Sequence, residues 1–105
     1  MSSAGAATVA DNPQAQRYEV SLDGELAGVA QYRARPGLIA FTHTEVEDRF
    51  EGQGLASKLI AFALDDGRRR GLDVLPFCPF VNKYVQRHPE YADLVPERYR
   101  AAFGL

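Results

Sequence analysis

The hydrophobic period of this 105-residue chain changes once, near its middle, and that change limits the folds that the chain can adopt. Over residues 17–22 apolar and polar side chains alternate, which is typical of a half-buried strand, and 38–46 opens with an apolar run that predicts a central strand. From about 54 to 70 the apolar residues recur at helical spacing instead. The sequence therefore predicts a sheet followed by an amphipathic helix.

Turn signals and element order indicate how the sheet is connected. Asp23-Gly24 and Arg35-Pro36-Gly37 predict two tight turns, so that 25–33 returns beside the first strand and a three-stranded meander forms. A further short strand is predicted over 72–77, and the succession of strand, helix and strand implies a parallel, right-handed crossover. The predicted fold class is α/β with a mixed sheet: an antiparallel three-stranded meander continued by a parallel strand through a crossover helix.

The two ends of the chain are predicted to differ. Residues 1–14 are small and polar and predict a disordered tail, which leaves 15–105 as a single domain. Pro79 is expected to begin a second helix, over 80–87, and the residues after it predict short helical turns that close over the core.

Charge and cysteine content narrow the class of partner. The formal net charge is −2, which favours neither nucleic acid nor an anionic membrane as a partner. The single cysteine excludes a disulfide within the chain, which fits a reducing compartment, and neither a signal peptide nor a membrane-spanning run is recognised. Because the two histidines and the cysteine are widely separated, no metal site is predicted. We expect a cytoplasmic protein.

Two glycines, Gly52 and Gly54, stand between the meander and the helix, where glycine weakens helix formation. Such a junction leaves main-chain N–H groups unpaired, and without a Cβ a phosphate can approach them closely. A tight turn with no ligand explains the same glycines. The segment is not a Walker loop, because G-K-[ST] is missing, and it lacks the third glycine of a dinucleotide fingerprint. The arginines at 68–70 lie about 25 Å along the helix, too far for that phosphate, and are expected to be a solvated terminus.

One stretch, over about residues 38–91, resembles the small single-domain branch of the GNAT N-acetyltransferases; it includes FTHTEVEDRFEGQGLASKLIAFALDDGRRRGLDVLPFCPFVNKYVQRHPEY. Members of that branch contain, in order, H-T-E-V, an acyl-CoA pyrophosphate loop, a helix, a strand, C-P-[FY]-V and H-P-E-Y. The resemblance implies a GNAT-like fold and acetyl-CoA as co-substrate. It also implies transfer of the acetyl group to an amine, for which we expect direct attack in a ternary complex in preference to a relay through the cysteine.

The resemblance further implies a co-substrate site. The superfamily's pyrophosphate loop, [QR]-x-x-G-x-[GA], corresponds to Glu51-x-x-Gly54-x-Ala56, with Glu51 where Arg or Gln is usual. Arg49 opens a second, shifted match and would supply a cation. The residues expected to bind CoA are Thr44, Glu45 and Val46 along the pantetheine arm; Arg49, Glu51, Gly52, Gln53, Gly54, Leu55, Ala56 and Ser57 around the diphosphate; Cys78 at the acyl end; and Lys83 at a phosphate, with plain solvation as its alternative.

Four residues are candidates for the chemistry of acetyl transfer. Cys78, at a strand end before a helix, is either a nucleophile or a wall of the thioester pocket. Tyr84 matches a tyrosine that protonates the leaving thiolate in many GNAT enzymes, or it is a core aromatic. His43 and Glu45 share one face of their strand and are candidate bases, although a strand histidine also serves structural roles.

Two other functions stay open. An acyl-CoA sensor would bind CoA without turnover, which Glu51 and the short chain, with little room for an acceptor groove, favour. A plain interaction domain would bind no such ligand. The sequence identifies neither the oligomeric state nor the acceptor amine, for which small molecules, protein lysines and N-termini are all candidates.

Overall fold

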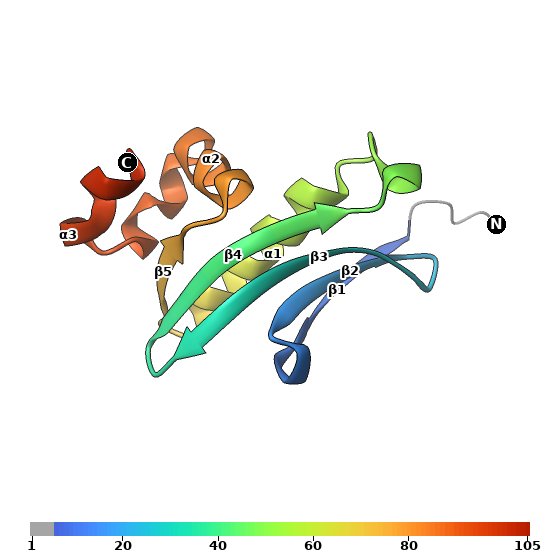
Figure 1. Cartoon of the computed structure of the whole chain (residues 1–105), viewed down its shortest axis with the longest axis horizontal. Helices are drawn as coiled ribbons and strands as arrows, with labels where there is room; N and C mark the ends of the chain where they lie inside the picture. The colour runs from blue at the N-terminus through green and yellow to red at the C-terminus, as the bar shows by residue number, and fades with distance from the viewer. Residues whose placement is uncertain (1–5) are drawn as a thin grey trace.

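The computed structural model describes residues 6–105, and its strands form one sheet in the order β1-β2-β3-β4-β5 (Figure 1). The strands are β1 (Ala7–Asn12), β2 (Arg17–Leu22), β3 (Glu25–Arg35), β4 (Leu38–Val46) and β5 (Asp73–Pro76). The helices are α1 (Leu55–Arg69), α2 (Pro79–Arg87) and α3 (Glu97–Arg100). Short 3-10 turns connect them: η1 (Pro13–Ala15), η2 (Asp48–Phe50), η3 (Pro89–Leu94) and η4 (Ala101–Phe103).

The strand pairing confirms the predicted fold class. Strands β2, β3 and β4 are antiparallel neighbours, and β5 pairs in parallel with β4 after the chain crosses over through α1. The ranges of these strands and of α1 and α2 agree closely with those expected from the hydrophobic period.

The predicted tail is wrong in its described part, because Ala7–Asn12 form β1. This strand pairs antiparallel with β2 along its whole length, so the meander has four strands instead of three. Its small side chains carry too weak an apolar alternation to predict a strand, and pairing with β2 supplies what the local sequence lacks. The hydroxyl of Tyr32 also donates a 2.6 Å hydrogen bond to Asp11 of β1. Residues 1–5 of the predicted tail lie outside the described residues.

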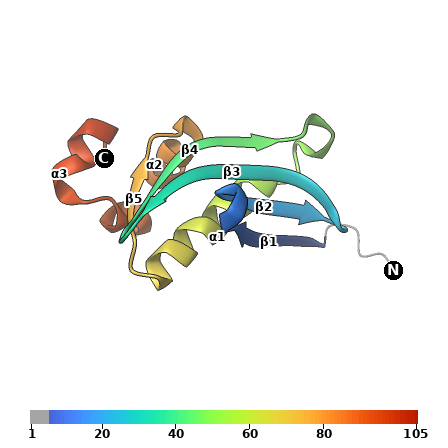
Figure 2. The ribbon, with the colours of Figure 1, turned by 60° about the horizontal axis from the view of Figure 1, so that its bottom comes forward.

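One face of the sheet is covered by α1 and carries the core (Figures 1 and 2). The largest fully buried side chains there come from both layers: Tyr18, Val20, Ile39, Phe41 and Val74 from the sheet, and Leu59, Ile60 and Leu64 from α1. Because burial of such side chains contributes about 1.5–3 kcal/mol each, α1 is held firmly across the sheet. Its first turn consequently lies beside the end of β4.

A β-bulge in β4 changes which of its residues face α1. The register between β3 and β4 shifts beside Gln31 and leaves Thr42 as the extra residue. Before the bulge the odd-numbered Phe41 is buried, whereas beyond it the even-numbered Thr44 faces the α1 side and the odd-numbered His43 is exposed. Alternation read from the sequence alone continues without such a switch, so the sequence does not indicate which face each residue takes.

The arginines at the C-terminal end of α1 are exposed, as expected of a solvated terminus, and they also form ion pairs that anchor this end of the helix. Arg68 donates two hydrogen bonds of 2.9 Å to the carboxylate of Asp93 and one of 2.6 Å to the main-chain oxygen of Glu90. The two arginines after it both bind Asp66 of the same helix. These contacts tie η3 to α1 and place the arginines in fixed structural roles.

Asp66 is the one buried charged residue in the described part of the chain. Its carboxylate accepts hydrogen bonds from Tyr18 at 2.5 Å, from Arg70 at 3.2 Å and from Arg69. Burial by itself would raise the pKa of Asp66, but these three hydrogen bonds outweigh burial and hold the pKa below its ordinary value. Burial and the same carboxylate raise the pKa of Tyr18. The network therefore joins β2 to the last turn of α1.

Candidate active site

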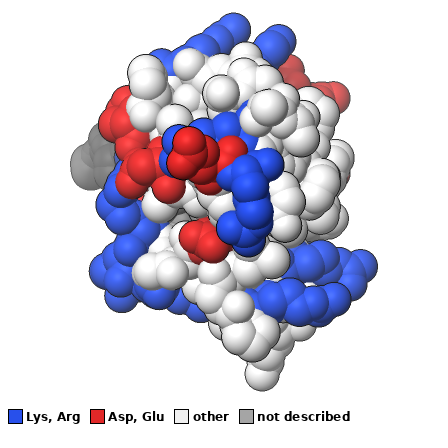
Figure 3. All heavy atoms as spheres, turned by 90° about the vertical axis from the view of Figure 1, so that its left-hand side faces the viewer, with Lys and Arg blue, Asp and Glu red and all other residues white. Residues whose placement is uncertain are grey.

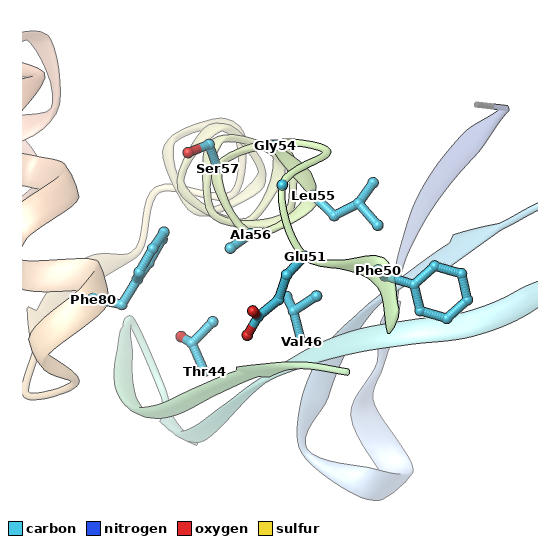
Figure 4. Close-up of a pocket in the computed structure, with 10 residues that line it drawn as sticks. Thr44, Val46, Phe50, Glu51, Gly54, Leu55, Ala56, Ser57 and Phe80 are labelled. Carbon is cyan, nitrogen blue, oxygen red and sulfur yellow. The ribbon is translucent and has the colours of Figure 1, made fainter. Parts of the chain in front are cut away.

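A pocket of about 330 Å³ opens where the end of β4 meets the starts of α1 and α2 (Figure 4). Its walls are Thr44, Val46, Phe50, Glu51, Gly52, Gly54, Leu55, Ala56, Ser57 and Phe80. All of these except Phe50 and Phe80 are among the residues expected from the sequence to bind CoA. The fold thus gathers segments on either side of the glycine junction around one hollow.

The two glycines that line this pocket both have positive φ angles. The angle is 85° at Gly52 and 72° at Gly54, and a Cβ added at either would meet nothing within 4 Å. Helix α1 has neither a side-chain N-cap nor an acidic residue in its first turn. Within residues 6–105, the N–H groups of 52–57 donate no hydrogen bond. Because they lie at the positive end of the helix dipole, these donors suit an anion.

The side-chain charge at the pocket is negative. Glu51 is the one charged residue in the lining, and its carboxylate points toward β4 (Figure 4). Arg49, expected as a cation for the diphosphate, is absent from the lining. It donates to Glu47 at 3.1 Å and to Glu25 at 3.5 Å, and its guanidinium lies 4.5 Å from the ring centroid of Phe50. The main chain, not a basic side chain, therefore offers the attraction for an anion here.

Strands β4 and β5 diverge beside the pocket. They pair only over Leu38–Phe41 and Asp73–Pro76, after which the N–H of Cys78 donates to the oxygen of Phe41 at 2.9 Å and α2 begins. Beyond Phe41, the edge of β4 that faces away from β3 pairs with no other strand in the described part of the chain. An extended ligand with amide groups can pair with such an edge as a strand would.

Cys78 lies beside the pocket but outside its lining. Its side chain is only 3% exposed, and its Sγ lies 3.3 Å from Oγ1 of Thr44, which does line the pocket. The hydroxyl of Thr44 is thus the contact that connects the thiol to the hollow. This position agrees with both roles considered for Cys78, a nucleophile or a wall.

His43 and Glu45 lie on the face of β4 away from α1. Nε2 of His43 is 3.1 Å from Oε1 of Glu45, and both side chains are exposed. The prediction that they share one face is confirmed, and the bulge at Thr42 determines that this face is opposite to the pocket. Any contact of these two residues with a ligand in the pocket has to pass between the diverging strands.

Three other predicted residues lie outside the pocket lining. Tyr84 stacks on His88, with 4.1 Å between ring centroids, and burial and nearby carboxylates raise its pKa. Lys83 lines a different hollow, beside Phe103. Gln53 is exposed within the glycine turn. The structure therefore brings none of the three to the lining of this pocket.

Two aromatic residues of the pocket were missed by the sequence analysis. Phe80 stands four positions before Tyr84 in α2, so helical spacing places both on one side of the helix and could have indicated it. Phe50 lies in η2, where a short irregular segment carries no periodic signal. Together they supply aromatic surface at two sides of the hollow.

No group of three or more His, Cys, Asp or Glu residues within 6–105 could hold a metal ion. The helices of this part of the chain are all too short or too polar to cross a membrane. On the end of the molecule that carries α3 and the C-terminus, basic and acidic side chains are interleaved (Figure 3). The pocket lined by Gly52 and Gly54, the glycine pocket, is therefore the candidate active site.

Comparison with known proteins relates the chain to one family. The family model described as GCN5-related N-acetyl-transferase matches residues 17–94, which contain the four strands from β2 to β5 and the pocket. No curated protein in the comparison is similar enough to count as a match.

Solved structures share the fold. A candidate GCN5-like N-acetyltransferase from Staphylococcus aureus, solved by NMR, superimposes with a TM-score of 0.64 at 20% identity, over 84% of this chain and 86% of that one. The ribosomal-protein-S18-alanine N-acetyltransferase from Escherichia coli does so with a TM-score of 0.54 at 17% identity, over 61% of this chain and 42% of that one. At such low identities the likeness extends to the fold alone.

Proposed function

The chain belongs to the GCN5-related N-acetyltransferase family, and we propose that it transfers an acetyl group from acetyl-CoA to an amine. The observation that carries the proposal concerns residues 52–57, whose main-chain N–H groups donate no hydrogen bond within the described part of the chain. Five of these six residues line a pocket beside the divergence of β4 and β5. This arrangement fits a ligand with an anionic end and an extended, amide-bearing arm. Acetyl-CoA has both.

In the proposed complex, acetyl-CoA lies along the pocket from α1 to the strand divergence. The diphosphate accepts hydrogen bonds from the main chain of 52–57. The pantetheine amides pair with the free edge of β4 at Thr44–Val46, including the main chain of Glu45. The acetyl group then reaches the neighbourhood of Thr44 and Cys78, whose side chains are in contact.

The proposed chemistry is direct attack in a ternary complex. The amine nitrogen attacks the thioester carbonyl carbon, a C–N bond forms, and the C–S bond breaks as the thiolate of CoA departs. His43 and Glu45 are the proposed route for the amine proton, since they form a hydrogen-bonded pair on the open face. Tyr84 is the proposed acid for the thiolate, because its hydroxyl carries a proton at neutral pH and it stands one helical turn after Phe80 of the pocket wall. An unidentified amine would approach from the open face.

Direct attack makes a specific prediction for Cys78. Because the thiol is almost fully buried and lies outside the pocket lining, Cys78→Ala is expected to retain turnover within about threefold of the parent chain. Intact-mass analysis after a rapid acid quench is expected to find no acetylated protein. A covalent relay would instead give an acetyl adduct on Cys78 and a variant without turnover that still binds acetyl-CoA.

The proposal is tested by incubating the chain with acetyl-CoA and a panel of small amines, lysine peptides and peptides with free N-termini. We expect release of CoA together with an acetylated amine, and thermal stabilisation by acetyl-CoA that reaches about 2.7 kcal/mol at 100 times the dissociation constant. Stabilisation without transfer to any amine would indicate the alternative of a non-catalytic acyl-CoA sensor, which the carboxylate of Glu51 in the pocket favours. If acetyl-CoA gives neither stabilisation nor transfer, the proposal is wrong.

A further inference from the structure

The glycine pocket combines an anion-binding main chain with a carboxylate, and the two oppose each other. The free N–H groups of residues 52–57 attract a diphosphate. Glu51 is the one charged residue among the lining residues. A diphosphate bound to these donors would therefore lie close to a negative side chain with no basic side chain in the wall to offset it.

The neighbouring cation does not compensate for Glu51. Arg49 is engaged with Glu47 and Glu25 and is absent from the lining. The side chain of Glu51 is exposed and forms no hydrogen bond or ion pair with any residue that the structure describes. Its carboxylate points toward β4, between the glycine turn and the strand (Figure 4). Nothing in residues 6–105 neutralises this charge.

We infer that Glu51 is a specificity-determining residue that opposes the diphosphate of the co-substrate and keeps CoA binding weak. The inference rests on the proposed function, since it assumes that CoA occupies this pocket. Acyl thioesters that lack a diphosphate are not repelled by Glu51. Glu51 therefore lowers the affinity for CoA thioesters but not for short pantetheine thioesters, and the difference between the two affinities becomes smaller. Repulsion of this kind also speeds the release of CoA after each turnover, because it raises the dissociation rate.

The test compares Glu51→Gln with the parent chain and with Asp48→Asn as a matched control. Asp48 carries the same charge nearby, is exposed, does not line the pocket and has no ion pair among the described residues. Calorimetric titration with CoA at low salt is expected to give roughly five- to thirtyfold tighter binding for Glu51→Gln. Binding of S-acetylpantetheine, which has no diphosphate, is expected to stay unchanged. The gain for CoA should shrink at about 0.5 M salt, where the Debye length is about 4 Å.

The outcomes separate this inference from the proposed function. If the parent chain binds CoA and Glu51→Gln binds it equally or more weakly, the inference is wrong. Weaker binding of both CoA and S-acetylpantetheine by Glu51→Gln would assign Glu51 as an acceptor for the pantetheine amides instead. An equal gain in Asp48→Asn would attribute the effect to overall charge and also overturn the inference. If neither the parent chain nor Glu51→Gln binds CoA, the proposed function itself fails.

Discussion

Replacing Ala56 by glutamate is expected to abolish CoA binding while leaving the fold intact. Ala56 lies in the first turn of α1, and its side chain lines the pocket (Figure 4). A carboxylate there would fill the space above the free N–H groups and repel the diphosphate, so we expect CoA affinity to fall by at least about 100-fold. The same carboxylate suits the helix dipole and should stabilise α1 by about 0.3–1 kcal/mol.

This pairing of effects makes Ala56→Glu informative. Most substitutions that abolish binding also loosen the fold, whereas this one is expected to keep or slightly raise the Tm measured by circular dichroism. Ala101→Glu is the control, because it introduces the same charge at an exposed position in η4. CoA binding by Ala56→Glu at the level of Ala101→Glu would mean that the first turn of α1 is not the diphosphate site.

The largest effect on stability is expected at Asp66, far from the pocket. Asp66→Asn removes the charge that Tyr18, Arg69 and Arg70 surround. Removing one member of a buried ion pair leaves the charges of its partners uncompensated. Because these arginines are partly exposed, we expect the free energy of unfolding to fall by about 2–4 kcal/mol. For a domain of this size that corresponds to a Tm lower by about 10–20 °C.

Two comparisons isolate the cause of that loss. Asp73→Asn, at an exposed carboxylate without an ion pair among the described residues, is expected to change the free energy of unfolding by less than about 0.5 kcal/mol. Tyr18→Phe removes one hydrogen-bond donor to Asp66 and keeps the ion pairs, so the free energy of unfolding is expected to fall by about 1 kcal/mol. If Asp66→Asn and Asp73→Asn unfold at the same denaturant concentration, the network contributes nothing to stability.

The Asp66 network also predicts how the difference depends on pH. The folded pKa of Asp66 lies below its ordinary value of 3.8, so its contribution is fully present above that value and is lost as pH falls through the folded pKa. The stability difference between the parent chain and Asp66→Asn should therefore be constant near neutral pH and narrow below about pH 4.

The order of the elements follows from the sequence because period and turn chemistry are local signals. The switch after β4, the Asp23-Gly24 turn and the helical stripe of α1 could all be read without tertiary information. Strand β1 could not, since its small residues form a strand only through pairing with β2. The bulge at Thr42 is a property of the register between two strands and leaves no mark on either strand alone.

The residues of the candidate site could likewise be predicted from the sequence only in part. Residues next to the glycines were expected together because they are contiguous, and contiguity places most of them in one pocket wall. Arg49 and Lys83 were expected there on position in the chain, but their side chains turn to Glu47 and to the hollow near Phe103. Where a long side chain points depends on partners that are distant in sequence, as with Arg49 and Glu25.

The central claim is that main-chain donors at the start of α1 hold the diphosphate of CoA, and a nuclear magnetic resonance titration tests it most directly. Backbone amide resonances would be followed as CoA is added to the 105-residue chain, with 3′-AMP, which has no diphosphate, as the control. The account predicts that the largest downfield amide shifts fall on residues 52–57 with CoA and are small with 3′-AMP. Saturable CoA binding that leaves those amides unmoved, with the shifts clustered elsewhere on the molecule, would contradict it.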